Sequence, residues 1–124
     1  MIIEANTIED FKNAVIEKSP EIKVTNPDMV KHFISFNRAK KYINLIAALL
    51  GTAILISIST GGLAGPAALA IMAPVIFIVG RAGVVAMITL GVALGGITAL
   101  KEFNKCYSVE QVNDGSIILR LKKE

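Results

Sequence analysis

The sequence has little of the chemistry on which enzymes and metal proteins depend. It holds one cysteine, Cys106, one histidine, His32, and no tryptophan. One cysteine cannot form an internal disulfide, and a histidine with no second histidine or cysteine nearby gives no metal site. No Walker A, dinucleotide-binding, nucleophile-elbow or zinc-protease motif is present. We therefore expect no enzymatic activity, no cofactor and no bound metal.

Charge is also missing from the middle of the chain. The 58 residues from Ile43 to Leu100 contain one charged residue, Arg81, and all ten Asp and Glu lie in the two flanks. A soluble domain scatters its charges, whereas a segment that faces lipid excludes them because an ion in hydrocarbon is costly. The pattern predicts an integral membrane protein with the lipid bilayer as its first partner.

The apolar block is too long for one crossing. As a single helix it would extend about 87 Å at 1.5 Å per residue, whereas the hydrocarbon core is about 30 Å thick. Glycine and proline divide the block near residues 60–66 and 80–83. We predict two spans, over residues 43–60 and 83–100, around a re-entrant or broken segment over residues 66–80. Its hinges are Gly61, Gly65, Pro66 and Pro74.

Basic residues abut both ends of the block, and positive charge prefers the cytosolic side. The start of the chain also lacks the basic region of a secretory signal. We therefore place both termini in the cytosol of a bacterial cell, with the spans in the plasma (inner) membrane. Three crossings, which would put the C-terminal flank outside, stay open. The topology anchors are Arg38, Lys40, Lys41, Lys101 and Lys105.

The two flanks, residues 1–41 and 102–124, predict a small α+β module. Alternating or β-prone runs predict strands at residues 2–5 and 21–25. Thr7 and Asn26 are typical helix N-caps, and the second helix has no breaker before residue 43. Asp114-Gly115 between two apolar-patterned runs predicts a hairpin. We expect a mixed sheet of about four strands from both ends of the chain. The fold class is thus an α-helical transmembrane hairpin, residues 42–101, with a cytosolic α+β module.

Small residues recur at four-residue spacing in the predicted spans, and such stripes let helices approach closely in lipid. We favour a homo-oligomer packed through these faces; the alternative is that they pack the chain's own two spans together. The stripe residues are Gly91, Gly95 and Ala99 in the second span, with Ala47 and Gly51 in the first.

Arg81 lies between two glycines at a segment boundary. A side chain that reaches the headgroups is the favoured interpretation, and a pore-lining or lipid-binding role is the alternative.

The functional interpretation depends mainly on the size of the apolar block, because nearly half of the chain is glycine-rich and apolar. We expect a small oligomeric pore-forming or membrane-perturbing effector, such as a toxin or defence protein, controlled by its cytosolic module. The alternative is a non-conducting anchor or scaffold that binds a cytosolic protein at an edge of its sheet. A third hypothesis is a soluble oligomer that buries the block and inserts when triggered. The net charge of +3 is too modest to indicate a nucleic-acid partner.

Overall fold

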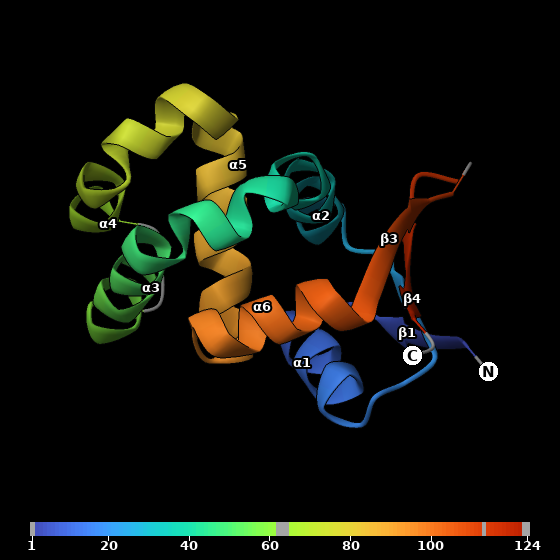
Figure 1. Cartoon of the computed structure of the whole chain (residues 1–124). Coiled ribbons are helices and arrows are strands. Elements are labelled where there is room, and N and C mark those ends of the chain that lie inside the picture. Colours follow the sequence, from blue (N-terminus) through green and yellow to red (C-terminus); the bar gives the residue numbers. More distant parts are fainter. Residues whose placement is uncertain (1, 62–64, 113, 123–124) are drawn as a thin grey trace.

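The computed structural model describes residues 2–61, 65–112 and 114–122. Figure 1 shows the sheet on one side, the apolar helices α3 and α4 on the other, and α5 between them. In chain order the elements are β1 (Ile2–Ala5), α1 (Ile8–Ile16), β2 (Glu21–Val24), α2 (Pro27–Ala39), the 3₁₀ turn η1 (Lys40–Tyr42), α3 (Ile43–Ser59), α4 (Pro66–Ile71), α5 (Ala73–Leu94), α6 (Ile97–Cys106), β3 (Tyr107–Gln111) and β4 (Ile117–Leu121).

The sheet joins the two ends of the chain, as predicted. Its strand order is β1-β2-β4-β3, with β1 and β2 parallel and the other neighbours antiparallel. Val24 pairs with Ile117 and Ile22 with Leu119, so β2 and β4 present their buried side chains to the same face. Of the predicted hairpin turn, Asn113 lies outside the described residues. The two flanks therefore form one unit on one side of the apolar helices.

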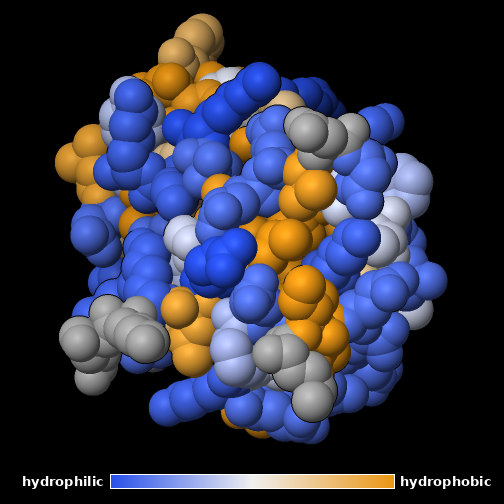
Figure 2. Space-filling model, turned by 90° about the vertical axis from the view of Figure 1, so that its right-hand side faces the viewer, coloured by the Kyte–Doolittle hydropathy of each residue, from blue (hydrophilic) through white to orange (hydrophobic). Residues whose placement is uncertain are grey.

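The outer face of the sheet is held by charged side chains. Arg120 pairs with Glu110 at 2.6 Å and with Glu21 at 3.3 Å, which links β4 to the strands on either side. Ile2 and Ile118 occupy outward positions beside these charges. Figure 2 looks onto this side of the molecule and shows a narrow hydrophobic band within a mainly hydrophilic surface. The sheet thus has one face for the helices and one for solvent.

Aromatic side chains fill the space between the sheet and the helices. Phe11 of α1 meets Phe33 of α2 with ring centroids 5.1 Å apart, and Phe103 of α6 stacks on Tyr107 of β3 at 5.4 Å. Phe36 joins the same group. Edge-to-face and offset pairs of this kind add to the burial of apolar area. This aromatic cluster ties three helices to the C-terminal hairpin.

The second half of α5 passes through the centre of the molecule. Val84, Met87 and Ile88 are fully buried, and α5 contacts α1, α2, α3 and α6. Its closest neighbour is α2, whose Ala39 lies against Gly83. An apolar helix is therefore enclosed by helices of the α+β part.

Helices α2 and α3 are joined by η1 without a loop, as predicted, and α3 matches the bounds expected for the first span. Together they make a helical stretch, Pro27–Ser59, that is long and apolar enough to cross a membrane. Helix α5, Ala73–Leu94, is the second such helix.

The predicted second span, residues 83–100, is wrong at both ends. Helix α5 starts at Ala73 and stops at Leu94, and α6 begins a separate helix at Ile97. Gly95 has a φ of 100°, and the Gly96 N–H donates to the Gly91 carbonyl at 2.8 Å. This is the left-handed glycine cap that ends many helices. The tandem glycine turns the chain back into the α+β part.

The segment over residues 66–80 contains α4 and the first part of α5, and the positions of its glycines and prolines can be given. Pro66 lies in the first turn of α4 and Pro74 in the first turn of α5, where the missing N–H has no helical partner to lose. Gly65 precedes α4 in an extended conformation, and Gly61 follows α3 with a φ of 112°. Gly80 has a φ of 82° and kinks α5. The proline positions thus start helices rather than interrupt them.

Candidate functional site: the apolar lobe and the adjoining groove

Helix α3, helix α4 and the part of α5 up to Gly80 form a unit that we call the apolar lobe. Figure 1 shows it on the side of the molecule opposite the sheet. Its inner surface is closely packed: Leu50 and Ile54 of α3 and Met72 are fully buried, and Val75 is nearly so. The buried side chains of the lobe therefore belong to the one core that also holds the α+β part together.

The outer surface of the lobe carries large apolar side chains. Phe77 is 93% exposed, Leu45 76%, Leu55 64% and Ile78 54%. Single exposed apolar residues are ordinary, but several on one apolar unit mark a surface for lipid or for another protein. Thr52 and Ser59 donate their hydroxyls to carbonyls of their own helix, so these hydroxyls need no water as a partner. The lobe thus presents hydrocarbon outward.

The predicted topology anchors fall into two groups. Arg38 and Lys41 are exposed and Lys40 is half-buried at the junction of α2 with α3, beside the lobe. Lys101 and Lys105 are exposed on α6. Because α6 belongs to the α+β part, those two lysines do not directly follow a helix that could cross a membrane. Only the first group lies at an end of the lobe.

The small-residue faces are occupied within the chain. A Cβ on Gly91 would collide with Ile54 of α3, whose Cγ1 would be 2.8 Å away, and one on Gly51 would meet Ile97 of α6 at 3.2 Å. The structure therefore uses these glycines in the alternative way, to pack the chain's own helices. The predicted continuous stripe is also wrong, because Gly95 ends α5 and Ala99 lies on α6. Ala47 is half-buried on α3.

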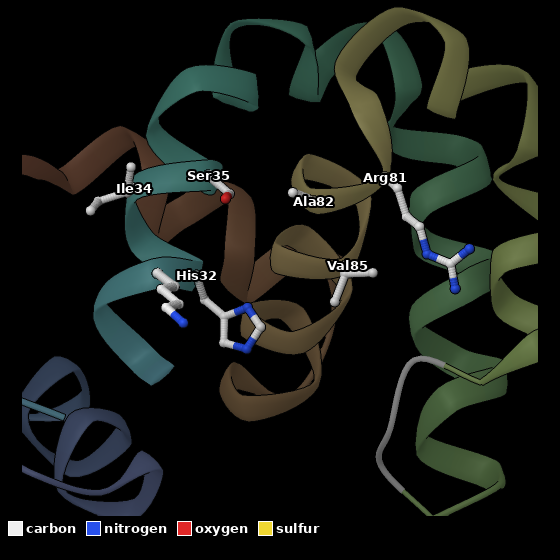
Figure 3. Close-up of a pocket in the computed structure, with 7 residues that line it drawn as sticks. His32, Ile34, Ser35, Arg81, Ala82 and Val85 are labelled. Carbon is white, nitrogen blue, oxygen red and sulfur yellow. The ribbon is translucent and has the colours of Figure 1, made fainter. Parts of the chain in front are cut away.

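A groove of about 640 Å³ adjoins the lobe between α2 and α5. His32 and Ser35 line it from α2, and Arg81 and Val85 line it from α5. Figure 3 shows the His32 imidazole directed across the groove towards Val85, whereas the Arg81 guanidinium points away from α2. His32 is half-buried and faces α5. The groove brings three basic side chains, Lys31, His32 and Arg81, to one opening, but they do not converge on one point.

Ser57 differs from the other hydroxyl residues of α3. Its side chain is fully buried, and its hydroxyl has no hydrogen-bond partner among the described residues. A buried polar group without a partner costs about 1–3 kcal/mol. This packing of the lobe therefore carries an internal penalty that a rearrangement could relieve.

Within residues 2–61, 65–112 and 114–122, no three metal-ligating side chains lie together. The chain matches no protein-family model, and it matches neither a curated protein nor a solved structure. The lobe, the groove and the enclosed helix α5 are therefore the features that bear on its function.

Proposed function

We propose that this chain is a membrane-perturbing effector whose apolar lobe enters the bilayer while its α+β part stays in the cytosol and controls it. The carrying observation is the exposure of Phe77, Leu45 and Leu55 on one helical hairpin. Transfer of such side chains from water to lipid is favourable by roughly 25 cal/mol per Å² of apolar surface. The cationic junction at Arg38 and Lys41 lies where anionic headgroups would meet the lobe.

Control by the α+β part is supported by the position of α5. Its second half is covered by α2, with Ala39 against Gly83. A hairpin that crosses the bilayer needs about 20 apolar residues in each arm, so α5 would have to leave α2 and α6. The closed arrangement therefore limits how far the lobe can insert. Release of α5 would complete the second arm. We propose that the lobe repacks in the same step and so gives the buried Ser57 hydroxyl a partner.

The proposed effector acts as a homo-oligomer in the membrane. Ile54 already occupies the Gly91 face, so we place the contact between copies on the outer surface of the lobe, around Phe77 and Ile78. This surface is apolar and exposed in one copy. Once Ser57 is released, its hydroxyl is a candidate to face a water-filled path between copies.

The second candidate function is a non-conducting anchor. The strands β1 and β3 form the two edges of the sheet, and exposed edges accept strands from other proteins. Ile2 and Ile3 are 52% and 37% exposed on β1. A cytosolic partner would add a strand there, and the lobe would only hold the complex at the membrane.

Dye release tests the two functions against each other. The purified protein is added to vesicles of phosphatidylethanolamine and phosphatidylglycerol that contain a self-quenched dye. We expect release from the wild type and a large loss of release from Phe77→Asn. The matched control is Ile8→Asn, because Ile8 is also an exposed apolar residue, at 47%, but lies on α1.

Two results would contradict the proposal. Vesicle binding without dye release would leave the anchor as the better function. Equal release from wild type and Phe77→Asn would show that the exposed surface of the lobe takes no part in the release of dye.

A further inference from the structure

A second cavity, of about 390 Å³, lies between α1, α6 and the end of β4. Its floor is apolar and is built from segments far apart in the sequence. Leu94 comes from the end of α5 and Ala99 and Phe103 from α6, while the strands and α1 supply the rest. The other floor residues are Val15, Ile16, Tyr107 and Leu121.

The floor is rigid because it is continuous with the aromatic cluster. Phe103 is buried between Phe11, Phe33 and Tyr107. The Tyr107 hydroxyl donates to the Ser19 carbonyl at 2.8 Å, so its polar end is satisfied inside the protein. Tyr107 therefore offers the cavity its aromatic ring rather than its hydroxyl. A preformed apolar surface of this kind loses little entropy when a ligand binds.

The rim of the cavity is cationic. Lys12, Lys18 and Lys122 line it and are exposed, against one acidic lining residue, Glu102. The ion pairs of the described chain include none of these three lysines. Lys18 stands at the end of α1 with a φ of 53°. Helix α1, the turn after it and the residue after β4 thus place, around an apolar hollow, ammonium groups that form no ion pair with the described residues.

We infer that this cavity binds a single-chain anionic amphiphile, a fatty acid, with its acyl chain on the floor and its carboxylate at the lysine rim. The size fits one chain, since ligand pockets span roughly 300–1,000 Å³ and this one is near the lower limit. The lysines complement a carboxylate, and they disfavour a cationic head of the same chain length. The site is distinct from the lobe surface, and its occupancy does not depend on the proposed membrane activity.

Cys106 allows a direct test because it is the one cysteine of the chain, is half-buried and lines the cavity. The full chain is placed in phosphatidylcholine nanodiscs, and the rate of maleimide addition to Cys106 is measured. Dodecanoate, dodecanol and dodecyltrimethylammonium are the probes. At ten times its dissociation constant, dodecanoate leaves about a tenth of the sites free, so the rate should fall roughly tenfold. Dodecanol should protect at higher concentration only, and the cation should not protect.

Two variants locate the effect. Ala99→Phe fills the cavity and should abolish protection, whereas Ala67→Phe, on the exposed side of α4, should not. Lys18→Glu with Lys122→Glu should weaken dodecanoate at least about tenfold, equivalent to roughly one charge pair lost at the rim. Lys101→Glu is the matched control, since Lys101 is exposed on α6 but does not line the cavity. If circular dichroism shows that Ala99→Phe does not fold, the double variant Lys18→Glu with Lys122→Glu serves as the test of the site.

Unchanged labelling with dodecanoate would overturn the inference. Equal protection by all three probes would overturn the carboxylate assignment, since it would show partition of an alkyl chain without selection of the head. A photoreactive dodecanoate that crosslinks to Phe77 and Ile78 alone would place the chain on the lobe and would likewise refute the site.

Discussion

Ala39 on α2 and Gly83 on α5 lie in direct contact, so that a Cβ on Gly83 would be 3.1 Å from the Cβ of Ala39. The Cβ atoms of a disulfide are about 3.5–4.5 Å apart. A small shift of either helix would therefore accommodate a covalent bridge at this point. The contact joins the α+β part to the helix whose release the proposed function requires.

A disulfide between these positions should hold the protein closed. In a Cys106→Ser background, Ala39→Cys with Gly83→Cys should form a bridge on oxidation. We expect the oxidised protein to bind vesicles with little dye release and to regain release when a thiol reductant is added. The control is Gly83→Cys alone, which should respond to neither oxidant nor reductant. Equal release from oxidised and reduced forms would show that α5 stays on α2 during activity.

Gly91 should be among the glycines least tolerant of substitution. A methyl group there collides with Ile54, whose Cγ1 would lie 2.8 Å away within a packed interface. Overpacking costs typically about 1–3 kcal/mol, more than the roughly 1 kcal/mol that alanine gains over glycine in a helix. We expect Gly91→Ala to lower the free energy of unfolding in detergent, measured by urea titration of the helical circular dichroism.

The comparison variant is Gly51→Ala, whose Cβ would meet Ile97 at 3.2 Å and needs only a small adjustment. We expect it to be close to neutral. In an Ile54→Ala background, Gly91→Ala should lose most of its effect, because contacting residues couple in a double-mutant cycle. Additive effects of the two substitutions would argue against the packing of α3 on α5 described above.

The sequence predicted the sheet better than the helices. A hairpin turn, an N-cap and the buried face of a strand each depend on residues close together in the sequence. They could therefore be predicted from Asp114-Gly115 and from the alternation along residues 21–24 and 117–121. The end of α5 could not, because glycine serves both as a small packing residue and as a left-handed cap. At Gly91 the first role applies and at Gly95 the second. Four-residue spacing does not distinguish them.

The sites were less predictable than the fold. The exposed apolar surface of the lobe follows from its composition, but which face is buried depends on the tertiary partners of α3. The groove joins His32 to Arg81 across many residues, and the 390 Å³ cavity combines α1, α6 and β4. No local pattern encodes contacts between such distant segments. The enclosure of α5 by α2 was missed for the same reason.

Tyr107→Phe should destabilise the protein through one lost hydrogen bond. The Tyr107 hydroxyl donates to the buried Ser19 carbonyl at 2.8 Å, and burial, with a smaller contribution from Cys106, raises the pKa of Tyr107. Removal of the hydroxyl leaves the carbonyl without this donor, which costs about 1–3 kcal/mol. Urea unfolding should show this loss, whereas Tyr42→Phe should be nearly neutral because the Tyr42 hydroxyl makes no hydrogen bond to the described residues.

The turn of the C-terminal hairpin should weaken in acid. The Asp114 carboxylate accepts hydrogen bonds from the Ser116 hydroxyl and the Ser116 N–H, and it pairs with Lys23 at 3.2 Å. These contacts, led by the Ser116 hydroxyl, lower the pKa of Asp114 from 3.8 to about 2. A carboxylate with a depressed pKa in the folded state contributes stability that is complete above its unfolded pKa and is lost as the pH falls through its folded pKa.

We therefore expect the contribution of Asp114 to be complete above about pH 5 and to disappear between about pH 4 and pH 2. Amide hydrogen exchange of residues 117–121, corrected for the intrinsic effect of pH, should accelerate over that interval. Asp114→Asn should show faster exchange at pH 6 and a weaker dependence on acid, because the amide has no proton to gain and no charge to offer Lys23. Parallel acid profiles for the two proteins would show that Asp114 is not the source of the acid sensitivity of this hairpin.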